Sequence, residues 1–284
     1  MATRIDGKAI AAKVRLEVAE QAHEFSKKFG RKPGLHVILV GDDPASAVYV
    51  RNKEKAADKA NIAGAIHRMP ADSSEASVLA KIVDLNERDD VDGILVQFPV
   101  PPQVSQNKVL ETIDPRKDVD GLHAESVGRL WSGLPGLISC TPAGCVRLLE
   151  EAGVTLEGKR AIVIGRSNLV GKPIAALLLN KNATVTLAHS RTVDLQARCL
   201  ESDIVIAAVG RAKMVPGSWI KPGAAVIDVG INRDEAGKLC GDVDYESVEK
   251  VAGCITPVPG GVGPMTIAML LKNTVQAANA RKTQ

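Results

Sequence analysis

Aromatic side chains are scarce in this 284-residue sequence, at 2% of its residues. Proteins that bind single-stranded nucleic acid stack bases on aromatic rings, so this composition argues against that class. The sequence also lacks a basic block that could follow a phosphate backbone, because its 36 lysines and arginines and 33 aspartates and glutamates are scattered along the chain. We therefore expect no nucleic-acid partner.

Long apolar runs and targeting signals are missing as well. No stretch of about 18 uninterrupted apolar residues occurs. The first residues, MATRIDGKAIAAKV, lack the basic-then-apolar order of a signal peptide. The sequence therefore predicts a cytoplasmic protein that does not enter a membrane.

Metal and disulfide patterns are also lacking, since the cysteines form no C-x-x-C pair and the histidines no H-E-x-x-H. We expect no metal site. Catalysis would then depend on lysine, tyrosine, carboxylates or an organic cofactor. The cysteines are interpreted as small buried hydrophobic residues: Cys140, Cys145, Cys199, Cys240 and Cys254.

Apolar, β-branched runs alternate with helical patterns, which predicts an α/β fold with parallel sheets. Strands are expected at 35–41 and 93–99, with helices at 45–61 and 74–87. A Gly- and Pro-rich change near WSGLPGLISCTP suggests a domain boundary. Beyond it, four strands of a Rossmann-type, doubly wound sheet are predicted in RAIVIG, ATVTLAH, DIVIAAVG and AAVIDVG.

Two domains are therefore expected. Residues 1–139 together with a C-terminal helix, 265–284, are predicted to form an N-terminal α/β domain of βαβ units. Residues 140–264 are predicted to form the Rossmann-type domain, which would bind a dinucleotide.

The segment AIVIGRSNLVGKP carries the dinucleotide prediction, with Gly165 at a strand end and Gly171 at a helix start. A pyrophosphate meets free backbone N–H groups at such a place. Ser167 stands where the G-x-G-x-x-G fingerprint has its second glycine, so a tight turn without a ligand remains an alternative.

The next strand ends in His189-Ser190-Arg191-Thr192, without the acidic residue that takes the ribose hydroxyls in NAD enzymes. A hydroxyl and a guanidinium attract a 2′-phosphate, so Ser190 and Arg191, with Arg166 as a second cation, favour NADP. Asp194 is expected to cap a helix. The later strand ends, AAVG and DVGIN, would adjoin the second half of the cofactor and include Ile231.

Three polar side chains, Ser46, Tyr49 and Lys53, fall on one face of the helix predicted at 45–61. Other cationic residues share this helix, so solvated surface charge is the alternative for Lys53. Gln97 falls at the carboxyl end of a buried strand, where ligands of open α/β sheets bind, although a satisfied polar end is more common. The acidic run KDVDG is interpreted as a solvated turn rather than a metal pair.

Taken together, these segments resemble the bifunctional methylenetetrahydrofolate dehydrogenase/methenyltetrahydrofolate cyclohydrolase family. The resemblance spans nearly the whole chain, through Tyr49-x-x-x-Lys53, GILVQFPVP, KDVDGLH, CTPAG, VIGRSNLVGKP and TPVPGGVGPMT, in the family's order. Phe98 replaces the leucine that is frequent in the second motif, which is a conservative change.

The resemblance implies an enzyme that oxidises 5,10-methylenetetrahydrofolate with NADP and then hydrolyses the methenyl product to 10-formyltetrahydrofolate. It also implies a homodimer. The catalytic residues that it implies are Tyr49, Lys53, Gln97 and Asp120. Substrate would meet Ser46, Tyr49, Pro259, Gly260 and Gly261, and NADP would meet Gly165, Arg166, Ser167, Ser190, Arg191 and Ile231.

Lys53 is the candidate for the proton transfers of the hydrolysis. Because a lysine with a pKa near 10.4 is a poor base at neutral pH, burial and the cationic intermediate would have to lower that pKa. Two alternatives stay open: another NADP-dependent Rossmann dehydrogenase acting on an amino acid or small hydroxy acid, and a non-catalytic NADP-binding sensor.

Overall fold

The computed structural model describes residues 1–282, except the side chains of Pro44 and Ala45. The chain divides into two compact units. Unit 1 consists of Met1–Ala12 and Thr141–Thr266, and unit 2 of Lys13–Cys140 and Ile267–Gln284. Two long helices, α1 (Gly7–Phe29) and α10 (Val262–Lys282), contribute residues to both units.

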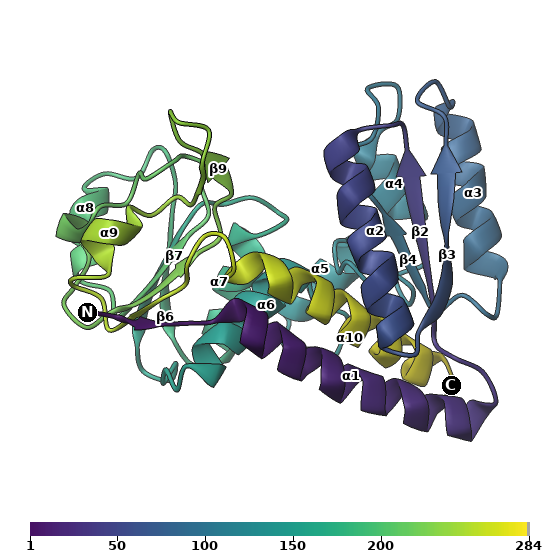
Figure 1. Cartoon of the computed structure of the whole chain (residues 1–284), viewed down its shortest axis with the longest axis horizontal. Helices are drawn as coiled ribbons and strands as arrows, with labels where there is room; N and C mark the ends of the chain where they lie inside the picture. The colour runs from purple at the N-terminus through teal and green to yellow at the C-terminus, as the bar shows by residue number, and fades with distance from the viewer. Residues whose placement is uncertain (283–284) are drawn as a thin grey trace. The chain divides into compact units, whose positions relative to one another are not determined.

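Unit 1 is built around a six-stranded sheet in which all neighbouring strands run parallel (Figure 1). In sheet order the strands are β1 (Thr3–Arg4), β11 (Cys254–Ile255), β8 (Ala225–Asp228), β7 (Ile204–Ala207), β5 (Arg160–Ile164) and β6 (Thr184–Ala188). The four strands predicted for the Rossmann-type sheet are present as β5 to β8. The two short strands were not predicted, because two residues are too few to show a periodic pattern.

The strands β7 and β8 are buried along their whole length, as expected for strands covered on both faces. They lie among the helices α6 (Cys140–Glu151), α7 (Gly171–Asn180), α8 (Leu195–Leu200), α9 (Tyr245–Val248) and the 3-10 turn η1 (Gly217–Trp219). An antiparallel hairpin, β9 (Asn232–Arg233) with β10 (Leu239–Cys240), follows β8. The predicted alternation of strands and helices is therefore confirmed here.

Residues 1–12 belong to unit 1, whereas the prediction placed them with residues 13–139 in the other domain. Strand β1 pairs with β11, and the backbone N–H of Ile5 donates to the carbonyl of Ile255 at 2.9 Å. Ile5 is 3% exposed, so burial of this side chain also ties the N-terminus to unit 1.

Unit 2 holds a three-stranded parallel sheet in the order β3 (Ala63–Met69), β2 (Gly34–Val40), β4 (Gly93–Val96). Since the chain crosses from β2 to β3 and then back past β2 to β4, right-handed crossovers place the two connecting helices on opposite faces. Figure 1 shows α2 (Pro44–Lys59) and α3 (Glu75–Glu87) on the two sides of this sheet. Both helices and both predicted strands are confirmed, and α4 (Gln106–Thr112) and α5 (Ala124–Trp131) complete the unit.

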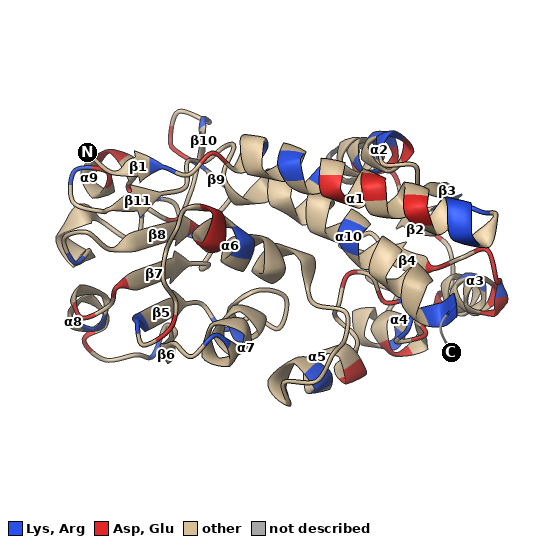
Figure 2. Cartoon of the chain, turned by 90° about the horizontal axis from the view of Figure 1, so that it is seen from below, with Lys and Arg blue, Asp and Glu red and all other residues tan. Residues whose placement is uncertain are grey.

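The long helices differ in their surface chemistry. Charged residues of both signs recur along α1, whereas α10 is mostly uncharged (Figure 2). Leu270, Leu271 and Val275 are buried on α10, as its apolar sequence predicts. Within residues 1–282, no helix is long and apolar enough to cross a membrane.

The prediction that all five cysteines are buried is only partly right. Cys140, Cys145 and Cys199 are buried, but Cys240 in the β9–β10 hairpin and Cys254 on the short strand β11 are partly exposed.

Two histidines form a pair across neighbouring strands of unit 2. His36 on β2 is 5% exposed, and its Nδ1 lies 2.8 Å from Nε2 of His67 on β3. Burial, together with the positive charge of Arg88, lowers the pKa of His36 to about 4, and burial also lowers the pKa of His67. The pair is therefore neutral at pH 7, with a single proton between the two nitrogens.

We predict that acid destabilises the fold through His36. Unfolded histidine takes up a proton near pH 6.5, whereas folded His36 does so only near pH 4, so the free energy of unfolding falls as the pH drops between these values. The loss is about 3 to 4 kcal/mol at most, from about 1.4 kcal/mol per pKa unit. Urea unfolding of the wild type and of His36→Leu at several pH values measures it, and equal pH slopes for both proteins would contradict the prediction.

Candidate active site

Helix α2 presents a polar face that contains the predicted lysine. The carboxylate of Asp43 accepts a hydrogen bond from the backbone N–H of Ser46 at 2.7 Å and so caps the helix. Ser46 and Lys53 are only 6% and 5% exposed, and Nζ of Lys53 lies 4.8 Å from the ring centroid of Tyr49. The predicted shared face is therefore formed. The other cationic residues of this helix are exposed, and they are Arg51, Lys55 and Lys59.

Gln97 provides the partner of the Lys53 amine. Nζ of Lys53 donates to Oε1 of Gln97 at 2.9 Å, and Nε2 of Gln97 donates to the carbonyl of Phe98 at 2.7 Å. The backbone N–H of Gln97 donates to Ile38 on β2, so the glutamine lies at the carboxyl ends of β4 and β2. Chain order reverses between these two strands, which is where open α/β sheets bind ligands.

The segment KDVDG is largely buried, so its prediction as a solvated turn is wrong about solvation. The chain does turn here, because the N–H of Gly121 donates to the carbonyl of Asp118 at 3.1 Å. Lys117 and Asp118 are each 1% exposed, and Val119 is fully buried. The segment runs beside β4, where the N–H of Ile94 donates to the carbonyl of Lys117 at 2.8 Å. It therefore acts as an extension of the sheet.

Lys117 can be buried because its ammonium group caps the C-terminal end of helix α3. Its Nζ donates to three backbone carbonyls, those of Leu85, Asn86 and Arg88, at 3.0, 2.6 and 2.8 Å. Such carbonyls have no partner within the helix, so the ammonium satisfies them. Burial lowers the pKa of Lys117 to about 8. No sequence pattern announces this three-dimensional arrangement.

Asp118 fixes the part of the chain that follows the segment. Its Oδ2 accepts hydrogen bonds from the N–H of His123 and the hydroxyl of Ser126, both at 2.8 Å. Both donors belong to the start of α5, so this carboxylate anchors that helix and closes the loop around Asp120.

Asp120 lies in one electrostatic cluster with Lys53 and Cys140. Burial raises the pKa of Asp120, while the charge of Lys53 and a hydrogen bond with the Cys140 thiol oppose that rise. Burial likewise lowers the pKa of Lys53, and Asp120 opposes that change. Burial thus favours the neutral forms of both groups, and the neutral amine of Lys53 is the form that can accept a proton.

Two residues that hold this cluster were missed by the sequence analysis. The thiol of Cys140, taken there as a small hydrophobic residue, donates to the carbonyl of Val119 at 3.3 Å. Nδ2 of Asn273 on α10 donates to the carbonyls of Val119 and Ile138, both at 2.8 Å. A lone asparagine in an apolar helix gives no sequence signal of such a contact.

In unit 1, the turn between β5 and α7 is shaped by two glycines. Gly165 has φ +124°, and a Cβ on it would lie 2.0 Å from the carbonyl oxygen of Ala208, which follows β7. A Cβ on Gly171 would lie 1.9 Å from the carbonyl oxygen of Gly165. Chain order reverses between β5 and β7, so the turn borders the expected dinucleotide position.

Ser167 occupies the second glycine position and closes the turn itself. Its hydroxyl oxygen accepts hydrogen bonds from the N–H groups of Val170 at 3.1 Å and Gly171 at 3.5 Å. The departure from the glycine fingerprint is thus accommodated, because the serine side chain satisfies the N–H groups at the start of α7.

The predicted phosphate-binding side chains gather at two neighbouring strand ends. Ser190 and Arg191 follow β6, Arg166 follows β5, and all three are exposed. The prediction that Asp194 caps a helix is wrong. This residue stands at the N-cap position of α8 but has φ 54° and makes no side-chain capping hydrogen bond, because its left-handed backbone does not direct the carboxylate to the helix.

The remaining predicted residues also lie in unit 1. Ile231 is 71% exposed, which is unusual for a large apolar side chain. Gly260 has φ +105°, and a Cβ on Gly7 would lie 1.8 Å from the carbonyl oxygen of Gly261, so α1 begins against this loop. In the described part of the chain, no group of three His, Cys, Asp or Glu residues could hold a metal ion.

Comparison with known proteins gives matches over almost the whole chain. Residues 5–120 match the catalytic domain, and residues 139–282 the NAD(P)-binding domain, of the tetrahydrofolate dehydrogenase/cyclohydrolase family. The bifunctional protein FolD of Sorangium cellulosum is 56% identical over 283 residues, which cover 99% of each chain.

Solved structures agree. The bifunctional FolD methylenetetrahydrofolate dehydrogenase/cyclohydrolase of Campylobacter jejuni has a TM-score of 0.96 at 46% identity, covering 99% of this chain and 100% of that one. The Trypanosoma brucei methylenetetrahydrofolate dehydrogenase-cyclohydrolase, solved with NADP and an inhibitor, has a TM-score of 0.94 at 39% identity, covering 100% and 99%.

The cluster geometry predicts that Asp120→Asn lowers the pKa of Lys53 further, because the carboxylate charge that favours the ammonium is removed. Titration of ¹³C-labelled lysine side chains by NMR measures this pKa. Glu54→Gln, which removes an exposed carboxylate from the same helix, is the control and should leave the value unchanged. A Lys53 pKa that is equal or higher in Asp120→Asn would refute the electrostatic coupling.

Proposed function

The chain belongs to the tetrahydrofolate dehydrogenase/cyclohydrolase family, and from this membership we infer which of its residues perform the family's two reactions. The protein is a bifunctional enzyme that oxidises 5,10-methylenetetrahydrofolate with NADP and hydrolyses the 5,10-methenyl product to 10-formyltetrahydrofolate. The other dehydrogenases and the non-catalytic sensor are not favoured, because matches to this family cover both units. The observation that carries the residue assignment is the buried Lys53–Gln97 pair next to Tyr49.

NADP is proposed to bind unit 1 at the carboxyl ends of β5 to β8. The glycines at positions 165 and 171 let the β5–α7 turn pack against its own backbone, and the turn leads to the N-terminus of α7, the kind of place where backbone N–H groups meet a pyrophosphate. Exposed Ser190, Arg191 and Arg166 supply a hydroxyl and cations for the 2′-phosphate. These residues would hold NADP, which would supply the hydride acceptor for the oxidation.

Within unit 2, the folate is proposed to meet Tyr49, Ser46 and Asp120. The family resemblance also assigns Pro259, Gly260 and Gly261, which belong to unit 1, to folate binding. We assign Asp120 to the pterin ring, because a carboxyl group can accept hydrogen bonds from the ring's N–H groups. Unit 2 would therefore be the folate-binding catalytic part and unit 1 the NADP-binding part. The predicted bounds, 1–139 with 265–284 and 140–264, differ from these units mainly at residues 1–12, which belong to unit 1.

Lys53 is proposed to move the protons of the hydrolysis. Its amine, held by Gln97, accepts a proton from the water that attacks the methenyl carbon. The resulting ammonium gives this proton to the ring nitrogen as the carbon–nitrogen bond opens, and the carbinol hydroxyl releases its proton to solvent. Acid–base help of this kind is worth about 10²- to 10⁴-fold in rate.

The assembly state and location are proposals from the family resemblance. We propose that the protein is a homodimer in the cytoplasm. Sedimentation equilibrium of the purified chain tests the first point, and a monomer at micromolar concentration would contradict it.

Spectrophotometry of the chain with methylenetetrahydrofolate and NADP, following the methenyl product, tests the overall function.

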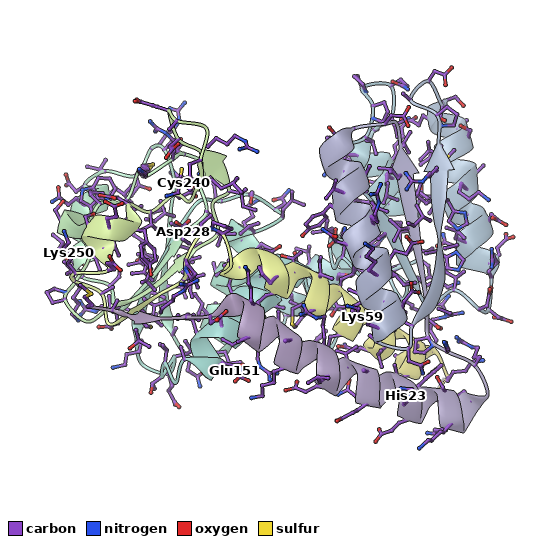
Figure 3. All side chains as sticks on the ribbon, viewed as in Figure 1. His23, Lys59, Glu151, Asp228, Cys240 and Lys250 are labelled. Carbon is purple, nitrogen blue, oxygen red and sulfur yellow. The ribbon has the colours of Figure 1, made fainter. Side chains whose placement is uncertain are left out.

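We predict that Lys53→Met hydrolyses methenyltetrahydrofolate at least about 10²-fold more slowly than the wild type, because methionine cannot accept and return a proton. Binding of NADP, measured by titration calorimetry, should persist. Lys59→Met, which changes an exposed lysine in the last turn of α2, is the control (Figure 3). Wild-type hydrolysis by Lys53→Met would remove this lysine from the mechanism.

Cofactor preference is predicted to depend on Arg191. Arg191→Ala should raise the KM for NADP about tenfold or more and leave the KM for NAD unchanged, because only NADP carries the 2′-phosphate that a guanidinium binds. Arg198→Ala, which removes an exposed arginine of α8, is the matched control in the steady-state assay. Parallel changes with both cofactors would argue against the assignment.

A further inference from the structure

Two carboxylates are buried in unit 1 outside the residues assigned so far. Asp228 ends β8, is 3% exposed and lies within the sheet layer of its unit (Figure 3). Its Oδ1 accepts hydrogen bonds from the N–H groups of Gly230 at 3.0 Å and Asp242 at 2.9 Å, and its Oδ2 accepts one from Val243 at 3.0 Å. This carboxylate thus joins the chain after β8 to the chain after β10.

Asp242 is fully buried and binds two further segments. Its Oδ2 accepts hydrogen bonds from Val209 N at 2.6 Å and Gly210 N at 3.1 Å. Its Oδ1 accepts from Arg211 N at 2.8 Å and from the side-chain amide of Asn232 at 2.9 Å. A buried carboxylate is tolerated only with such a set of donors, so the site commits all of these groups to fixed positions.

The glycines of the neighbouring motifs are explained by these carboxylates. A Cβ on Gly230 would lie 2.4 Å from Oδ1 of Asp242, and a Cβ on Gly241 would lie 1.8 Å from Oδ2 of Asp228. Any side chain at either position would displace a carboxylate. The runs DVGIN (228–232) and GDV (241–243) therefore pack directly against each other through these two carboxylates.

The segments held in this way lie where the cofactor is proposed to bind. Residues 209–211 follow β7 and residues 230–232 follow β8, at the carboxyl ends of the sheet. Ile231 is 71% exposed, and both of its chain neighbours are tied to the two carboxylates. Both neighbours of this exposed apolar side chain are thus held by hydrogen bonds within the protein.

We propose that Asp242, supported by Asp228, is a positioning residue that holds the 209–211 and 230–232 segments in the shape that receives the nicotinamide half of NADP. The proposal rests on the proposed function, because that function places the cofactor at Ile231. Pre-set binding segments lower the ordering cost of binding, so the effect belongs to cofactor affinity.

The carboxylate of Asp242 has two effects that an asparagine would not reproduce: its charge acts on Asp228, and both of its oxygens accept hydrogen bonds. Burial raises the pKa of Asp228 to about 7, the backbone N–H donors oppose this rise, and the nearby charge of Asp242 adds to it. An asparagine at position 242 would keep one acceptor oxygen but direct an NH₂ group at N–H donors. Some of the donors from Val209, Gly210 and Arg211 would then be left unsatisfied.

The test uses the two activities of the intact enzyme as mutual controls. Asp242→Asn is expected to raise the KM for NADP at least about tenfold in the dehydrogenase assay. Hydrolysis of methenyltetrahydrofolate without NADP should stay within about twofold of wild type, because it depends on Lys53 in unit 2. Asp244→Asn, two residues away at an N-cap without a side-chain capping bond, should leave both activities unchanged.

A milder variant keeps the test decisive if Asp242→Asn does not fold. Asn232→Ala removes one donor from Oδ1 of Asp242 and leaves its backbone donors in place. It is expected to raise the KM for NADP about threefold or more with little change in hydrolysis. A wild-type KM for NADP in folded Asp242→Asn, or equal loss of both activities in Asn232→Ala, would overturn the inference.

Failure of this inference can be told apart from failure of the proposed function. A wild-type protein that does not oxidise methylenetetrahydrofolate with NADP would overturn both. An active wild type whose Asp242→Asn and Asn232→Ala variants keep the normal KM for NADP would overturn the positioning role alone.

Discussion

Burial of one amine is the constraint on which the proposed chemistry depends. Nζ of Lys53 has lost most of its water, is held by Gln97 at 2.9 Å and lies 4.8 Å from the centre of the Tyr49 ring. Desolvation favours the neutral amine, while Asp120 pulls in the other direction. In the proposed mechanism, this balance would let one lysine both accept and return a proton, which an exposed lysine with its ordinary pKa cannot do efficiently.

Buried charged groups with backbone partners recur in both units and hold loops within each unit. In unit 2, the Lys117 ammonium binds three carbonyls at the end of α3, and the Asp118 carboxylate binds the start of α5. In unit 1, Asp228 and Asp242 bind N–H groups of the loops after β7, β8 and β10. Each ion is costly to bury alone, so its partners are fixed with it. The loops at the carboxyl ends of the strands are thereby held without further regular structure.

Much of this could be predicted from sequence wherever a periodic pattern is long enough. The strands β5 to β8 follow from apolar, β-branched runs, and the shared face of Tyr49 and Lys53 follows from helical spacing. Strand β1 was missed because two residues carry no period. KDVDG was mistaken for a solvated turn because its burial depends on carbonyls of α3 that lie about thirty residues earlier, at Leu85 to Arg88. Asp242 and Asn273 were missed for the same reason, since their partners are remote in sequence.

The proposed hydrolysis requires the Lys53 amine to be available in neutral form at the pH where the enzyme works. The pH dependence of kcat for methenyltetrahydrofolate hydrolysis by the wild type tests this most directly. The rate should rise with loss of a proton from a group whose pKa lies well below the ordinary lysine value of 10.5. A rate that rises only around pH 10.5, or that shows no ionisation between about pH 6 and 10, would contradict the account.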